Sequence, residues 1–142
     1  MSVAARRALQ SYGAVHNRGR VEGADPAQLI ILLFDAAISA LRAAELHIAR
    51  GARQEKCDAL EKATEIVVAL QGSLDQEKGG ELADTLDSLY TYCLRRILEA
   101  NAQNSAEKAA EVRGYLEELH GAWENAAAAV KASPLSLHHL GR

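Results

Sequence analysis

Residues 74–101 read LDQEKGGELADTLDSLYTYCLRRILEAN, and this stretch decides the fold. The pair Gly79-Gly80 breaks the chain between two segments in which apolar residues recur every three or four positions. The segment after the break carries one helical stripe, made of Leu82, Leu86, Leu89, Cys93, Ile97 and Ala100. Because a short connection makes successive helices antiparallel neighbours, the stretch predicts a helical hairpin.

The helix before the break stops near Asp75. Its apolar positions are Leu60, Ala63, Val67, Leu70 and Leu74. Their alternating spacing of three and four is typical of a helix that faces a neighbour in a bundle.

The first helix of the chain has the clearest ends. Asp25 can accept hydrogen bonds from unpaired amides as N-cap, and Pro26 suits the first helical position. The apolar stripe that follows consists of Ile30, Leu33, Phe34, Ala37, Leu41, Ala44 and Ile48. Gly51 can adopt a left-handed cap. We therefore predict a helix from Pro26 to about Arg50.

The last helix carries a strict heptad stripe of Ala109, Val112, Leu116, Leu119, Trp123, Ala126 and Val130. Either Asn104, with Glu107 three residues later, or Ser105 caps its start, and Ser133-Pro134 ends it. No period-two run predicts a strand. The chain is therefore expected to be all-α, an antiparallel four-helix bundle.

The two ends of the chain lack this periodicity. Residues 1–24 contain four arginines and one glutamate, a charge of +3, so the total of −3 leaves −6 on the remainder. We predict a flexible basic N-terminal arm over residues 1–24, the bundle over 25–131, and a flexible C-terminal tail over 132–142.

Composition excludes several classes of protein. The chain has 142 residues, about the length of one domain. Its net charge of −3 does not favour binding to the phosphates of a nucleic acid. No segment looks like a targeting signal or a run of 18 apolar residues, so neither export nor membrane insertion is predicted. Cys57 and Cys93 lack CxxC spacing, and Cys93 lies on a buried stripe, which fits a reducing compartment. The expected location is cytoplasmic.

No catalytic or metal-binding site is expected, and no cofactor. Glu117 and His120 form a single Glu-x-x-His pair, whereas a di-metal bundle needs two such pairs. His47, followed by Arg50 and Gly51, resembles a histidine phosphotransfer site. Such a site needs a helix that continues past the glycine, whereas Gly51 is predicted to end this helix. A phosphotransfer-like bundle and a purely structural bundle stay as alternatives.

Several large apolar and aromatic residues lie in addition to those that the core of a bundle requires. Leu29, Ile31 and Leu32 flank the first apolar stripe, so the helix is either buried centrally or offers a groove to an amphipathic partner. Tyr90 and Tyr92 are two positions apart and cannot share a face, so at least one lies at a boundary or surface.

Arg95, Arg96 and Asn101 follow the tyrosines on the same predicted helix. Each either contacts a partner or braces the bundle through acidic neighbours and helix ends.

At these residues the chain resembles the flagellar export chaperones known as FliS. The resemblance covers nearly the whole chain. Its motifs are Tyr12, Pro26-x-Gln28-Leu29-Ile30, Leu33-Phe34-Asp35, the turn at 74–81, Leu89-Tyr90-x-Tyr92-x-x-Arg95-Arg96, Ala100-Asn101 and Ala122-Trp123.

The resemblance implies a cytoplasmic chaperone, not an enzyme. Such a protein binds the disordered C-terminal region of flagellin, prevents premature polymerisation and aids delivery to the flagellar type III export gate. It also implies that Tyr12 covers part of the client groove in the free protein. Together with the residues singled out above, the expected client contacts are Tyr12, Leu29, Ile31, Leu32, Tyr90, Tyr92, Arg95, Arg96 and Asn101.

Overall fold

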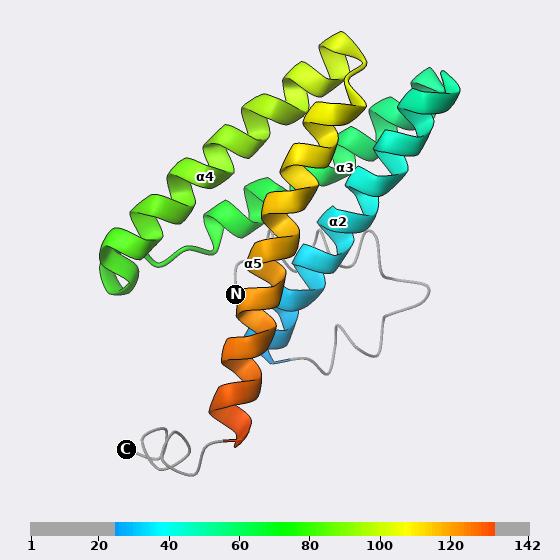
Figure 1. Ribbon diagram of the computed structural model, residues 1–142. Helices are drawn as coiled ribbons and strands as arrows, with labels where there is room; N and C mark the ends of the chain where they lie inside the picture. The colour runs from blue at the N-terminus through cyan, green and yellow to red at the C-terminus, as the bar shows by residue number, and fades with distance from the viewer. Residues whose placement is uncertain (1–24, 133–142) are drawn as a thin grey trace.

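The computed structural model describes residues 25–132, which form four α-helices. They are α2 (Pro26–Arg50), α3 (Arg53–Gly72), α4 (Gln76–Gln103) and α5 (Ala106–Ala132). Each helix runs antiparallel to the one before it (Figure 1), and no strand occurs in the described range. The predicted all-α antiparallel bundle is confirmed. The predicted arm and most of the predicted tail lie outside the described residues.

Helix α2 is the centre of the packing. It makes the most extensive contacts with α3 and with α5, while α4 completes the ring through its own contacts with α3 and α5. Its large side chains Phe34, Leu33 and Leu41 are fully buried. Two packed faces explain why α2 is apolar beyond one stripe. Leu29 and Leu32 belong to the core, so the centrally buried alternative holds for them.

The ends of α2 lie at the predicted residues. Asp25 Oδ1 accepts a hydrogen bond from the Gln28 amide at 2.8 Å, and Pro26 occupies the first position. Gly51 closes the helix with φ 70°, a left-handed conformation that glycine adopts without steric cost.

The turn between α3 and α4 lies earlier than predicted. It spans Ser73 to Asp75, and Asp75 Oδ1 accepts from the Lys78 amide at 3.0 Å as the N-cap of α4. The glycine pair instead marks a kink inside α4, where Gly80 has φ 54° and ψ −129°. The predicted break at Gly79-Gly80 is present as this kink, but α4 starts one turn earlier than predicted, because Asp75 caps it before the glycines.

The turn between α4 and α5 settles the choice of cap. Asn104 ends α4 in the left-handed conformation, and Ser105 Oγ accepts from the Lys108 amide at 3.1 Å. Lys56, a buried lysine of α3, reaches this turn. Its Nζ donates to the Asn101 carbonyl at 3.1 Å and to Asn104 Oδ1 at 2.6 Å. The ammonium therefore satisfies carbonyl groups at the C-terminal end of α4.

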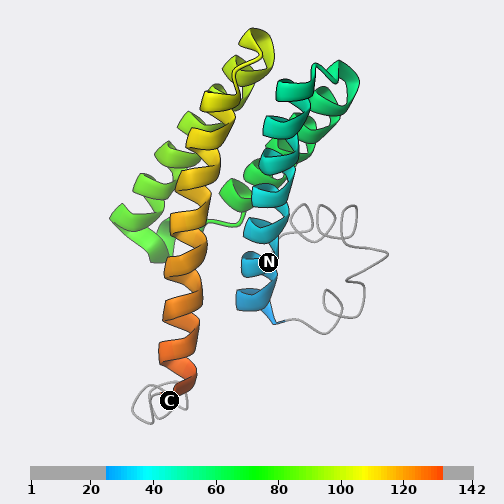
Figure 2. The same ribbon diagram turned by 45° about the vertical axis from the view of Figure 1, so that its right-hand side comes forward.

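Helix α4 diverges from α5 with distance from their connecting turn. The two helices are close at the turn, and the first residues of α4 stand well apart from α5 (Figures 1 and 2). The α4–α5 pair is also the least extensive of the four helix contacts. No helix within residues 25–132 is long and apolar enough to span a bilayer.

Candidate functional site

Three of the predicted client contacts are core residues. Leu29, Leu32 and Tyr90 have exposed fractions of 0%, 7% and 2%. Burial raises the pKa of the Tyr90 hydroxyl, and it raises the pKa of the neighbouring Cys93 thiol to about 11. The predicted burial of Cys93 is confirmed. A packing role accounts for these side chains, and client contact by them stays a prediction.

Tyr92 belongs to a polar cluster centred on Glu111. The cluster joins α4 to α5, and we call its members Tyr92, Arg96, Glu111 and Tyr115 the Glu111 cluster. Glu111 Oε2 accepts from the Tyr92 hydroxyl at 2.6 Å and from the Tyr115 hydroxyl at 3.2 Å. Arg96 Nε donates to Glu111 Oε1 at 2.8 Å. The tyrosine rings meet edge to face with centroids 6.2 Å apart.

The electrostatics of this cluster favour a charged carboxylate. The hydrogen bond from Tyr92 and those from Arg96 and Tyr115 hold the pKa of Glu111 below its ordinary value. The same hydrogen bond raises the pKa of Tyr92, because it stabilises the protonated hydroxyl. Arg96 also pairs with Glu99 at 3.2 Å. These contacts support the bracing alternative for Arg96.

The other predicted residues are spread over the molecule. The Arg95 guanidinium is exposed and lies 5.3 Å from the centre of the Tyr92 ring. Asn101 braces the turn, since its carbonyl accepts from Lys56 and its Oδ1 accepts from the Cys57 thiol at 3.6 Å. Ile31 is half-buried on α2. Tyr12 lies outside the described residues.

The most distinctive surface lies where α4 and α5 diverge. Leu82 on α4 is 67% exposed and Trp123 on α5 is 38% exposed, although both belong to stripes predicted to be buried. Leu86 and Leu89 of α4 and Leu119 of α5 are half-buried against the core. We call these five side chains the apolar rim. The prediction that Leu82 and Trp123 face the core was wrong.

Divergence of the two helices explains this exposure. Within the described residues, the polar contacts between α4 and α5 all lie between Tyr92 and the connecting turn. On the far side of Tyr92, no polar contact holds α4 to α5 in the described part of the chain. Helical periodicity identifies a face but not the distance to the next helix, so the sequence carries no signal for the rim.

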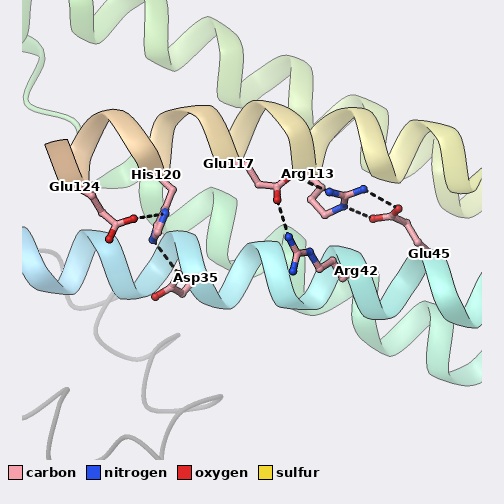
Figure 3. Close-up of polar contacts among 7 residues, drawn as sticks. All are labelled: Asp35, Arg42, Glu45, Arg113, Glu117, His120 and Glu124. Carbon is pink, nitrogen blue, oxygen red and sulfur yellow. Dashed lines mark hydrogen bonds and ion pairs between the residues drawn. The ribbon is translucent and has the colours of Figure 1, made fainter.

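Ion pairs line the contact between α2 and α5 (Figure 3). Arg113 binds Glu45 through two nitrogens, at 2.6 and 3.2 Å, and Glu117 at 2.7 Å. Arg42 of α2 reaches the other oxygen of Glu117 at 2.7 Å. The Arg42 hydrogen bond and the charge of Arg113 hold the pKa of Glu117 below its usual value, and the bond to Glu45 raises the pKa of Arg113.

The Glu117 and His120 pair has partners that a metal site would not share. Glu117 is occupied by two arginines, while His120 lies between Asp35 and Glu124. Among residues 25–132, no group of three His, Cys, Asp or Glu side chains is placed to hold a metal ion. His47 lies in the last turn of α2, four residues before the glycine cap Gly51.

Comparison with known proteins gives a consistent result. Residues 8–130 match the sequence model of the family described as flagellar protein FliS. The flagellar secretion chaperone FliS of Salmonella typhimurium is 44% identical over 82% of this chain and 87% of its own length. Flagellar secretion chaperone FliSB of Pseudomonas aeruginosa is 36% identical over 84% of this chain and 95% of its own. Escherichia coli FliS is 35% identical over 84% and 89%.

Proposed function

The chain belongs to the FliS family of flagellar proteins, whose curated relatives are flagellar secretion chaperones, and from this premise we propose that its client is flagellin. The protein binds the disordered C-terminal region of flagellin in the cytoplasm. It thereby prevents premature polymerisation and aids delivery to the flagellar type III export gate.

The observation that carries this proposal is the apolar rim. The bundle leaves Leu82 and Trp123 exposed, on the two helices that diverge with distance from their connecting turn. Exposing large apolar side chains costs about 25 cal/mol for each Å² that could be buried. A partner that covers them recovers this free energy, so the rim suits a segment with an apolar face.

A disordered amphipathic segment is the kind of partner that fits. Such a segment cannot bury its apolar residues alone, and it aggregates or polymerises when left free. Docking one helical face against the rim hides those residues from other copies of flagellin. Part of the interaction free energy is spent on ordering the segment, which keeps the complex reversible.

Tyr12 and the remaining predicted contacts belong to this proposal. Tyr12 covers part of the client surface in the free protein, so the arm and the client compete, and the affinity falls by the fraction of closed molecules. Tyr12→Ala then strengthens client binding in a titration while the helix content measured by circular dichroism stays constant. Global unfolding of Tyr12→Ala would contradict this role.

The test of the client is a pair of flagellin truncations. The purified chain is mixed with full-length flagellin of the same cell, with flagellin lacking its C-terminal segment, and with flagellin lacking an N-terminal segment of equal length as the matched control. We expect a one-to-one complex with full-length flagellin and with the control, measured by light scattering after size-exclusion chromatography. No complex with full-length flagellin, or survival of the complex after C-terminal truncation, would refute the proposal.

A further inference from the structure

We propose that His120 is a proton-dependent clamp that holds the last turns of α5 against α2. Its imidazole lies between two carboxylates from different helices (Figure 3). Nδ1 is 2.9 Å from Glu124 Oε1 on α5, and Nε2 is 2.9 Å from Asp35 Oδ1 on α2. The inference does not depend on the identity of the client.

The chemistry of imidazole makes this arrangement sensitive to a proton. A neutral ring carries one N–H and can donate to only one of the two carboxylates, while its other nitrogen turns a lone pair toward an oxygen. The protonated ring donates from both nitrogens. Nε2 is buried and lies 2.9 Å from Asp35 Oδ1 without a well-directed hydrogen bond, so this contact depends on the charge of the ring. Protonation therefore strengthens the contact with Asp35, which is the contact between the helices.

The balance of charge around the ring favours the same conclusion. In the neighbouring group on the same interface, Arg42 and Arg113 face Glu45 and Glu117, so two positive charges meet two negative ones. Around His120, two carboxylates face one imidazole, and the ring must be protonated to offset even one of them. The two groups lie side by side along the helices (Figure 3).

The groups that face the ring in the described residues come from α2 and α5. From α2, Asp35 faces the ring, and the Phe34 ring meets it edge-on with centroids 6.4 Å apart. From α5, Glu124 faces it, and Glu117 one turn earlier is bound by arginines. Within the described residues, α4 contributes no charged contact to the imidazole. The side chain is 19% exposed and both carboxylates are half-exposed, so the solvent moderates the effect.

The clamp lies near the end of α5, where it affects the side chains of the apolar rim. Among the described residues, the Asp35 contact is the polar contact between α2 and α5 nearest the C-terminal end of α5. Leu119 and Trp123 of the apolar rim flank His120 on the same helix. Loss of the proton therefore loosens the part of α5 that carries two of the five rim side chains.

Unfolding of the full chain at two pH values tests the clamp. Histidines gain their proton between about pH 8 and pH 5, so wild type and His120→Gln are unfolded with urea at pH 5.5 and pH 8.0. We expect the substitution to increase the unfolding equilibrium constant by a factor that is about three- to tenfold larger at pH 5.5 than at pH 8.0. An equal factor at both pH values, or a larger one at pH 8.0, would overturn the proposal.

A second variant separates the clamp from a simple effect of a charged ring. Trp123 is the single tryptophan of the chain, so its fluorescence reports on this part of α5. Asp35→Asn keeps His120 and Glu124, and we expect it to lose most of the change in Trp123 emission between pH 5.5 and 8.0. His47→Gln, the matched control in the last turn of α2, should keep that change. A full response in Asp35→Asn would show that Asp35 takes no part.

Discussion

At the scale of single residues, the polar side chains with the most contacts join one helix to another, and these contacts are made without a partner protein. Glu111 is the clearest case, since two tyrosine hydroxyls and one guanidinium converge on its carboxylate. Several charge-assisted hydrogen bonds to one carboxylate are together stronger than a single exposed ion pair. The joint between α4 and α5 therefore explains Tyr92 and Arg96 of the tyrosine and arginine motif.

Glu111→Gln should lower the melting temperature at neutral pH by about a few degrees, because three donors lose a charged acceptor. The lowered pKa of Glu111 fixes the pH dependence. A carboxylate whose pKa is depressed by folding stabilises the protein above its unfolded pKa, near 4.3, and that stability is lost as the pH falls through the folded value. The difference between variant and wild type should therefore shrink below about pH 4, as measured by thermal melts followed by circular dichroism.

The control for this substitution is Glu118→Gln, since Glu118 is an exposed glutamate on the same helix. It should leave the melting temperature nearly unchanged. A Glu111→Gln difference that persists undiminished at acid pH would show that the carboxylate charge is not what the cluster uses. In a tyrosine titration, the same variant should also bring the raised pKa of Tyr92 and of Tyr115 toward the ordinary value.

At the scale of elements, backbone chemistry explains where the helices end and bend. Asp25, Asp75 and Ser105 each accept from an amide three residues later, so three of the four helices start at a side-chain cap. Gly80 is different, because its φ of 54° with ψ of −129° bends α4 after its first turn. The kink lies two residues before Leu82, so it affects the direction in which this exposed side chain of the rim points.

Gly80→Ala should destabilise the protein by about 1–3 kcal/mol, because an L side chain rarely adopts this backbone conformation. The cost is conformational, since a Cβ at this position meets no atom within 4 Å. Urea unfolding measures it. Gly114→Ala is the matched control in the middle of α5, where a Cβ also meets nothing within 4 Å, and it should stabilise by about 0.5–1 kcal/mol. Equal effects of the two substitutions would mean that α4 straightens at Gly80 without penalty.

At the scale of the whole molecule, the divergence of α4 from α5 creates the surface that matters for the proposed function. Leu82 and Leu98 lie on the same helix with nearly equal exposure, 67% and 68%. Leu82 is at the open end of the bundle, and Leu98 is near the closed end, beyond the Glu111 cluster. Because the two residues are the same amino acid with nearly the same exposure, comparing them tests where on the molecule the client binds.

Leu82→Ser should weaken the proposed complex with flagellin about tenfold, because an exposed leucine is no longer there to be buried on binding. Leu98→Ser should change the affinity by less than about twofold. Both substitutions remove an exposed side chain, so both should change stability by no more than about 0.5 kcal/mol. Isothermal titration with the C-terminal flagellin segment measures the affinities. Equal losses for the two variants would place the client somewhere other than the rim.

Several features of this protein could be predicted from local sequence. Helix α2 runs from Pro26 to Arg50 as expected, because caps and apolar period act within a few residues of the chain. The resemblance at Tyr90, Tyr92 and Arg95-Arg96 pointed to the correct family for the same reason, since a motif is a property of neighbouring positions. The turn at 74–81 was placed less well, because two nearby residues each mark a possible start of the helix. Asp75 is a capping residue, and Gly80 is a glycine that interrupts helical geometry.

The sequence by itself determined the four helices, most of their ends, the buried stripes near the turns and the family. The tertiary structure alone decided which apolar residues remain outside. Leu29 and Leu32 became core because α2 packs on two sides, and Leu82 and Trp123 became surface because α4 and α5 part. It also decided the ion pairs that join Arg42 and Arg113 to residues 75 and 68 positions away. Periodicity fixes the direction of a side chain on its own helix, whereas exposure and pairing depend on the distance to a helix far along the chain.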